Sequence, residues 1–152
     1  YRRSLYTFWK RTLGPPAMLT FDSAARETCV VREVRTNTPM QALNLMNDVT
    51  YGEASRLLAG RMIREGGSHA GARLSYGFRL GTARLPSRAE REILLRGLRR
   101  YQIRYRAEPR DAKIYLHQGE HPRDMSVDVV ELAAYTAVGS LILNLDETIT
   151  KQ

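Results

Sequence analysis

Apolar positions recur at helical spacing along most of the chain, and turn residues separate the segments. Residues 2–12 fit one amphipathic helix, which the Gly14-Pro15-Pro16 run ends. Residues 18–21 are predicted to be short and extended, and residues 22–27 can form a single capped turn. Residues 28–34 are rich in β-branched side chains, which favour a short strand. Because the chain offers no second strand to pair with it, an extended loop packed on helices is the alternative.

Capping residues mark four further helix starts. A Ser or Thr followed three residues later by Glu or Gln can satisfy two free amides, and this pattern occurs at Thr38/Gln41, Thr50/Glu53 and Ser87/Glu90. Ser68 can cap a fourth helix. The predicted helices run from Thr38 to about Asn47, from Thr50 to about Glu65, from Ser68 to Gly81, and from Ser87 to about Arg106.

The last predicted helix, residues 127–147, is apolar nearly all round, which is typical of a helix in the middle of a bundle. Its uncharged run from Leu132 to Leu145 is too short to span a membrane, because a span needs about 20 residues. Glu131 lies near the helix start, where a carboxylate favours the helix dipole. The pattern predicts one all-α domain over residues 1–152, a small irregular bundle of about six helices with a short extended segment near residues 28–34.

Charge is unevenly distributed along the chain. The net charge is +8, yet residues 1–110 carry 21 basic and 9 acidic residues, whereas residues 111–152 carry 3 and 7. This asymmetry indicates either an anionic partner for the first part or packing of the acidic part against the basic part. The densest basic stretch, residues 88–110, has eight arginines and two tyrosines and is either an anion-binding surface or a solvated helix face.

Cys29 is the only cysteine, so the chain has no internal disulfide, no zinc cluster built from cysteines and no CxxCH haem attachment. We therefore predict no cofactor in this chain. His117, Glu120 and His121 match the H-x-x-E-H pattern of one zinc peptidase class and are weak metal candidates. Gly119 and Pro122 disfavour the helix that this chemistry requires, and we interpret the segment as a solvated loop.

Polar residues exceed what helix capping requires just before residue 39. Pro39 suits the first helical position, but Arg32, Arg35, Thr36, Asn37 and Thr38 form a larger polar cluster. One interpretation is structural, with the arginines tied to carboxylates such as Asp22 or Asp48. The other is an anion site in which Arg35 and the amides of the following helix hold the ligand.

Several of these stretches resemble a planctomycete family of unknown function. The similarity covers Ser4 to Arg11, the double proline, Met18 to Asp22, Arg35 to Asp48 and Val138 to Glu147. The family domain is longer at its N-terminal side and often occurs in large exported proteins with a cytochrome c-type domain. The resemblance implies a periplasmic or exported protein, with haem c on a missing segment or partner, and supplies no catalytic residue.

Three functions follow from these observations. The first is a non-catalytic structural or interaction module of an exported, cytochrome c-associated protein, with other domains or chains of that protein as partners. The second is a binding module for an anionic polymer such as a sulfated polysaccharide, with nucleic acid disfavoured. The third is the C-terminal part of an enzyme whose catalytic residues lie in a missing N-terminal portion, since the chain starts at Tyr1, without a methionine, and therefore looks like a fragment or a processed piece.

Overall fold

The computed structural model describes residues 6–10, 13–23, 29, 31 and 36–149. Within these residues the secondary structure is helical, with eight helices and no strand, so the predicted all-α class is confirmed. The chain divides into two compact units, residues 1–44 and 45–152. Helix α2 (Pro39–Asn47) contains the boundary between them.

In the first unit, helix α1 (Pro16–Thr20) occupies a stretch that was predicted to be extended. Pro15 takes the N-cap position and Pro16 the first turn, where a fixed φ favours helix. The helix predicted over residues 2–12 is wrong for residues 7–10, where Lys10 instead forms an isolated bridge with Leu13. Such a short helix needs an apolar surface to pack on, and these side chains lack one, since Phe8 is 79% exposed.

Other predictions for this unit fall largely outside the described residues. Of the predicted strand near residues 28–34, only Cys29 and Val31 are described, and neither is in a strand. The capping box that opens α2 is confirmed in both directions. The Gln41 amide donates to Thr38 Oγ1 at 3.3 Å, and the Thr38 amide donates to Gln41 Oε1 at 3.0 Å.

In the second unit, helices α3 (Val49–Glu65) and α4 (Ala70–Thr82) begin differently from the prediction. Asp48, rather than Thr50, caps α3 by accepting the Thr50 amide at 2.8 Å. His69, rather than Ser68, caps α4 through Nδ1, which accepts the Ala72 amide at 3.1 Å. In both cases a neighbouring acceptor satisfies the free amides of the first turn.

The remaining helices are α5 (Arg88–Ala107), α6 (Pro109–Leu116), α7 (Val129–Leu143) and α8 (Asp146–Ile149). The Ser87/Glu90 capping box of α5 is confirmed. Pro109 ends α5 and also begins α6, because a helix's first turn does not need its missing amide. The last predicted helix is shorter than expected, since the chain turns at Asn144 and restarts as α8.

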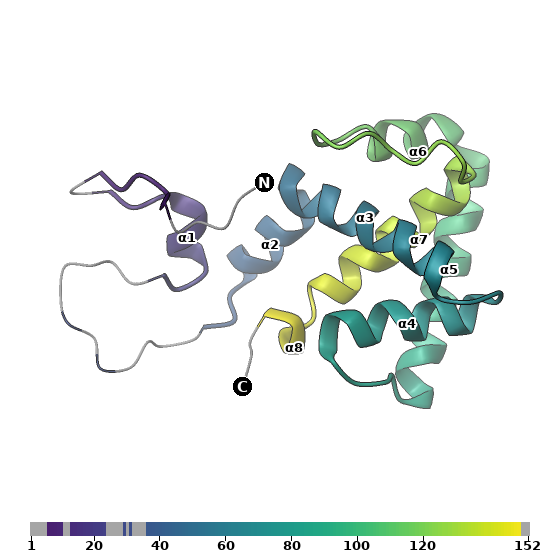
Figure 1. Cartoon of the computed structure of the whole chain (residues 1–152), viewed down its shortest axis with the longest axis horizontal. Coiled ribbons are helices and arrows are strands. Elements are labelled where there is room, and N and C mark those ends of the chain that lie inside the picture. The colour runs from purple at the N-terminus through teal and green to yellow at the C-terminus, as the bar shows by residue number, and fades with distance from the viewer. Residues whose placement is uncertain (1–5, 11–12, 24–28, 30, 32–35, 150–152) are drawn as a thin grey trace. The chain divides into compact units, whose positions relative to one another are not determined.

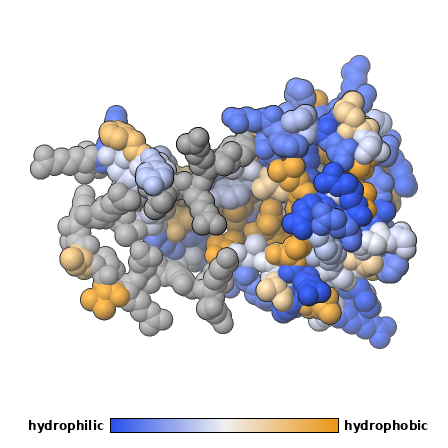
Figure 2. Space-filling view, in the orientation of Figure 1, coloured by the Kyte–Doolittle hydropathy of each residue, from blue (hydrophilic) through white to orange (hydrophobic). Residues whose placement is uncertain are grey.

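Helix α7 lies in the middle of the second unit, as its uniformly apolar sequence predicts, and packs against α3, α4, α5, α6 and α8 (Figure 1). Small residues allow close approach: a Cβ added at Gly139 would lie 3.0 Å from the Ser55 carbonyl oxygen of α3. The visible face of this unit is largely hydrophilic, with apolar side chains between the polar ones (Figure 2). No helix among the described residues has the length and apolar character needed to cross a bilayer. The largest fully buried side chains are those of Tyr135, Phe78, Met62, Leu74, Leu98, Leu116, Leu132 and Ile142.

Candidate functional site

The polar cluster before α2 is partly described, and its threonines lie in a hydrogen-bond network with Asp22. The Thr36 amide donates to Asp22 Oδ2 at 2.6 Å, and the Thr36 hydroxyl donates to Oδ1 at 2.8 Å. Buried Gln41 donates from Nε2 to the Thr20 carbonyl oxygen at 2.9 Å. The hydrogen bond from the Thr36 amide is the main reason that the pKa of Asp22 lies below its usual value.

This network ties residues 20–22 to the start of α2. Arg32 and Arg35 lie outside the described residues, so the choice between a structural cluster and an anion site stays open. The Gln41 amide, which the anion interpretation required, is already bonded to Thr38. Asp22, which could have paired with an arginine, accepts from Thr36. The described members of the cluster therefore join residues 20–22 to the start of α2.

The H-x-x-E-H segment forms a loop after α6. His117 is the C-cap of α6 and is exposed, whereas Gly119 has a φ of +94°, a left-handed conformation that ends any helix. The His121 ring contacts its neighbour's carbonyl, with Nδ1 2.8 Å from the Pro122 oxygen. No three His, Cys, Asp or Glu residues within the described ranges could hold a metal ion together.

A buried ion pair on α3 binds the backbone of this loop. Glu53 is only 3% exposed, and its Oε2 accepts the amides of Glu120 at 2.6 Å and His121 at 3.2 Å. Arg56, 5% exposed, donates to the carbonyl oxygens of Leu116 and His121. The Arg56 Nη2 to Glu53 Oε2 distance is 4.0 Å. We call this arrangement the loop clamp. The sequence does not indicate this arrangement, because the spacing of Thr50 and Glu53 predicts a capping box and its partners lie 67 and 68 residues away.

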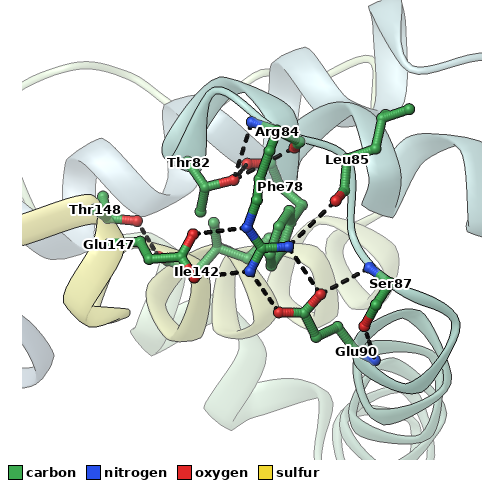
Figure 3. Close-up of polar contacts among 9 residues, drawn as sticks. All are labelled: Phe78, Thr82, Arg84, Leu85, Ser87, Glu90, Ile142, Glu147 and Thr148. Carbon is green, nitrogen blue, oxygen red and sulfur yellow. Dashed lines mark hydrogen bonds and ion pairs between the residues drawn. The ribbon is translucent and has the colours of Figure 1, made fainter.

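A second polar junction joins α4, α5 and α8 (Figure 3). The Arg84 guanidinium donates two hydrogen bonds to Glu147, from Nε at 2.8 Å and from Nη2 at 2.7 Å. Its Nη2 also donates to Glu90 at 2.7 Å. Its Cζ also lies 4.9 Å from the centre of the Phe78 ring. Hydrogen bonds from Arg84, then from Ser87, lower the pKa of Glu90 to about 2. The junction anchors the short α8 to two longer helices.

The basic stretch forms the outer side of α5 and the start of α6, and all eight arginines are exposed. Arg88 pairs with Glu92 at 3.2 Å, and Arg104 lies 3.9 Å from Asp111. The other six form no ion pair within the described part of the chain. Three- and four-residue spacing brings several of them onto one side together with two isoleucines. We call this side the arginine face, and it comprises Ile93, Arg96, Arg99, Arg100, Ile103 and Arg106.

The tyrosines of the same helix do not belong to this face. Tyr105 is buried and Tyr101 half-buried, and their ring centres are 6.4 Å apart. Tyr105 stacks in turn with Tyr115 of α6 at 6.1 Å, and burial raises the pKa of Tyr115 to about 12. These rings pack in the interior of the unit together with Leu94 and Leu98. They offer no exposed platform for stacking nucleobases.

Comparison with known proteins gives one family. The sequence model of the family described as "PSD1: Protein of unknown function (DUF1553)" matches residues 1–98. No curated protein matches the chain. No solved structure matches it either.

Proposed function

The chain belongs to the PSD1 family of proteins of unknown function, and we propose that it is a non-catalytic interaction module within a larger exported, cytochrome c-associated protein. The observation that carries this proposal is the arginine face of α5. A solvated helix face usually mixes both charges. From Arg96 to Arg106 the arginine face has four arginines without an ion pair within the described residues and no acidic residue, and Glu92, one turn earlier on the same side of α5, pairs with Arg88 at 3.2 Å.

The arginine face is supported by a rigid scaffold. Leu94, Leu98 and Tyr105 anchor the opposite side of α5 in the core, so the arginines project from a fixed helix. Elsewhere in this unit several charged groups are used internally: the loop clamp holds a loop, and Arg73 bonds Glu131 of α7 at 2.8 Å. The arginine face instead gathers four arginines without an ion pair, within the described residues, on one side of one helix, which suits an outside partner.

The partner that fits best is an acidic protein surface with some apolar character. Ile93 and Ile103 are 58% and 68% exposed in the middle of the arginines. An apolar side chain gains by being covered, and a carboxylate can bind a guanidinium in a bidentate manner. Other domains or chains of the same larger protein are the partners that we propose.

A second candidate is an anionic polymer, most simply a sulfated polysaccharide. Arginine matches the planar geometry of sulfate and carboxylate oxygens, and the face contains no lysine. Nucleic acid is disfavoured because Tyr101 and Tyr105 pack inward instead of presenting stacking surfaces.

Export and the association with cytochrome c rest on the family resemblance of the motifs at residues 4–11, 35–48 and 138–147. In this proposal haem c is carried by another segment or by a partner, and the chain itself holds no cofactor. The exported location follows from the same resemblance.

The test measures how two variants change the binding of three ligands. The ligands are the remaining part of the full-length protein, supplied as a separate polypeptide, and dextran sulfate, with duplex DNA as a third probe. The variants are the double change Arg96→Glu and Arg100→Glu, and the single change Ile103→Ser. Binding is measured by calorimetry at low and at physiological salt, since a generic charge effect collapses as salt rises.

For the interaction module, both variants should weaken binding to the rest of the protein at physiological salt. Loss of about 1–3 kcal/mol for Ile103→Ser, which is roughly a fivefold to 150-fold loss of affinity, follows from its burial in an interface. For the polysaccharide candidate, only the charge reversal should matter. Binding to dextran sulfate and DNA alike that disappears at physiological salt, with no binding to the rest of the protein, would refute the arginine face as a specific surface.

A further inference from the structure

A pocket of about 360 Å³ lies beside the loop clamp, in the second unit of the chain. Its walls come from three segments that are distant in sequence. Helix α3 contributes Leu57, Gly60 and Arg64, the loop contributes Arg123 and Asp124, and α7 contributes the buried Leu132. The volume is at the small end of the range for sites that bind small molecules.

The pocket combines an apolar lining with an excess of positive charge. Arg64 Nη1 pairs with Asp124 Oδ2 at 2.9 Å, so these two charges offset each other. Arg123 is half-buried and has no hydrogen bond or ion pair within the described residues. A half-buried guanidinium that is not paired within the described residues is available to bind an anion in the pocket.

Buried Arg56 adds a second cation to the same wall. Its two terminal nitrogens hold the loop carbonyls, but its Nε is buried and has no partner within the described residues. Buried donors are nearly always satisfied, so an unused one next to a pocket is informative. The clamp thus fixes the loop and leaves one donor of Arg56 unused beside the pocket.

We propose that this pocket binds a small organic anion, a carboxylate with a compact apolar body. The carboxylate would pair with Arg123, and its apolar body would lie against Leu57 and Leu132. Bidentate pairing of a carboxylate with a guanidinium is strong where water is partly excluded. The site is separate from the arginine face, none of whose residues line the pocket.

Benzoate is a suitable probe, and neutral benzamide has nearly the same shape. Calorimetric titration of the purified chain should detect benzoate, while benzamide should bind at least about tenfold more weakly, because it lacks the charge. Arg123→Gln should weaken benzoate binding about tenfold or more, because it removes the charge that pairs with the carboxylate. The fold should remain intact, because Arg123 has no partner within the described residues. Arg79→Gln removes the same charge from an exposed position on α4 that does not line the pocket, and it is the control for net charge.

A second pair of variants tests the cavity itself. A Cβ at Gly60 would meet only Arg64 Nη2, at 3.8 Å, so Gly60→Leu should fill the pocket without disturbing the helix. A Cβ at Gly97 in α5 would meet nothing within 4 Å, and Gly97→Leu is the corresponding control. We expect Gly60→Leu to abolish benzoate binding and Gly97→Leu to leave it unchanged.

Three results would overturn the proposal. The first is no heat of binding for benzoate up to about 10 mM, a very weak affinity for a built site. The second is equal binding of benzamide. The third is an equal loss in Arg79→Gln and Arg123→Gln, which would mean a generic effect of net charge. Arg123→Gln should leave binding to dextran sulfate or a protein partner unchanged, so this proposal and the proposed function can fail separately.

Discussion

Removing the carboxylate of the loop clamp should destabilise the protein strongly. Glu53→Ala leaves the amides of Glu120 and His121 without their acceptor and leaves Arg56 as a buried charge without a counter-ion. Breaking a buried pair by removing one partner typically costs about 3–5 kcal/mol. The lost hydrogen bonds are part of that figure and are not added to it. We expect a loss near the middle of this range, because Arg56 keeps its two carbonyl acceptors.

Two further variants separate charge from hydrogen bonding. Glu53→Gln keeps an acceptor oxygen but loses the charge, so it should cost less than Glu53→Ala, about 1.5–3 kcal/mol. The double variant Glu53→Gln with Arg56→Met should be less destabilised than the sum of its single changes, because it leaves no unpaired buried charge.

Urea unfolding followed by circular dichroism measures the free energy of unfolding of each variant. Amide hydrogen exchange adds a local reading, since the Glu120 and His121 amides should lose their protection first. The matched control is Glu120→Ala, whose side chain is exposed on the same loop and which should change stability by less than about 0.5 kcal/mol. A loss below about 1 kcal/mol for Glu53→Ala, or unchanged protection of the two amides, would show that the clamp does not hold the loop.

Three further predictions concern the Arg84 junction, two glycines and the absence of zinc. Arg84→Gln should lower the melting temperature at pH 7. The pKa of Glu90 is depressed from 4.5 to about 2 in the folded protein. The difference in melting temperature between Arg84→Gln and the unaltered protein should therefore be complete above about pH 4.5 and vanish as the pH falls towards 2. A difference in melting temperature that does not depend on pH would contradict this. Gly66→Ala should destabilise by about 1–3 kcal/mol in thermal unfolding, because its Cβ would lie 2.7 Å from Arg73 Cα, whereas Gly97→Ala should stabilise by up to about 1 kcal/mol. Metal analysis of the purified protein should find no stoichiometric zinc and no change on His117→Ala; zinc that is lost in this variant would revive the enzyme interpretation.

The local signals in the sequence predicted most of the helices. The capping box at Ser87 and the one at Thr38 work because both partners lie within four residues, so tertiary structure has little influence on them. Thr50/Glu53 has the same spacing and failed for a tertiary reason. Asp48 is a competing cap next to it, and Glu53 bonds amides 67 and 68 residues away.

The candidate sites were harder to predict because they depend on which segments meet. The sequence indicated that Thr36 exceeds what a helix start requires, but not that Thr36 would bond Asp22, 14 residues earlier. The pocket beside the clamp combines α3, a loop and α7, and no periodicity within a single segment could indicate it. The arginine face was predictable, because one helix contains it entirely.

The central position of α7 has a consequence for how the protein is made. This helix is synthesised after α3, α4, α5 and α6, all of which pack against it. Until residues 129–143 have left the ribosome, the apolar sides of the earlier helices have no α7 to pack against. Folding of the bundle should therefore be a late step that closes contacts between distant parts of the sequence, and such steps are slow. A chain interrupted before residue 129 should expose its core and be degraded rather than persist as a smaller bundle.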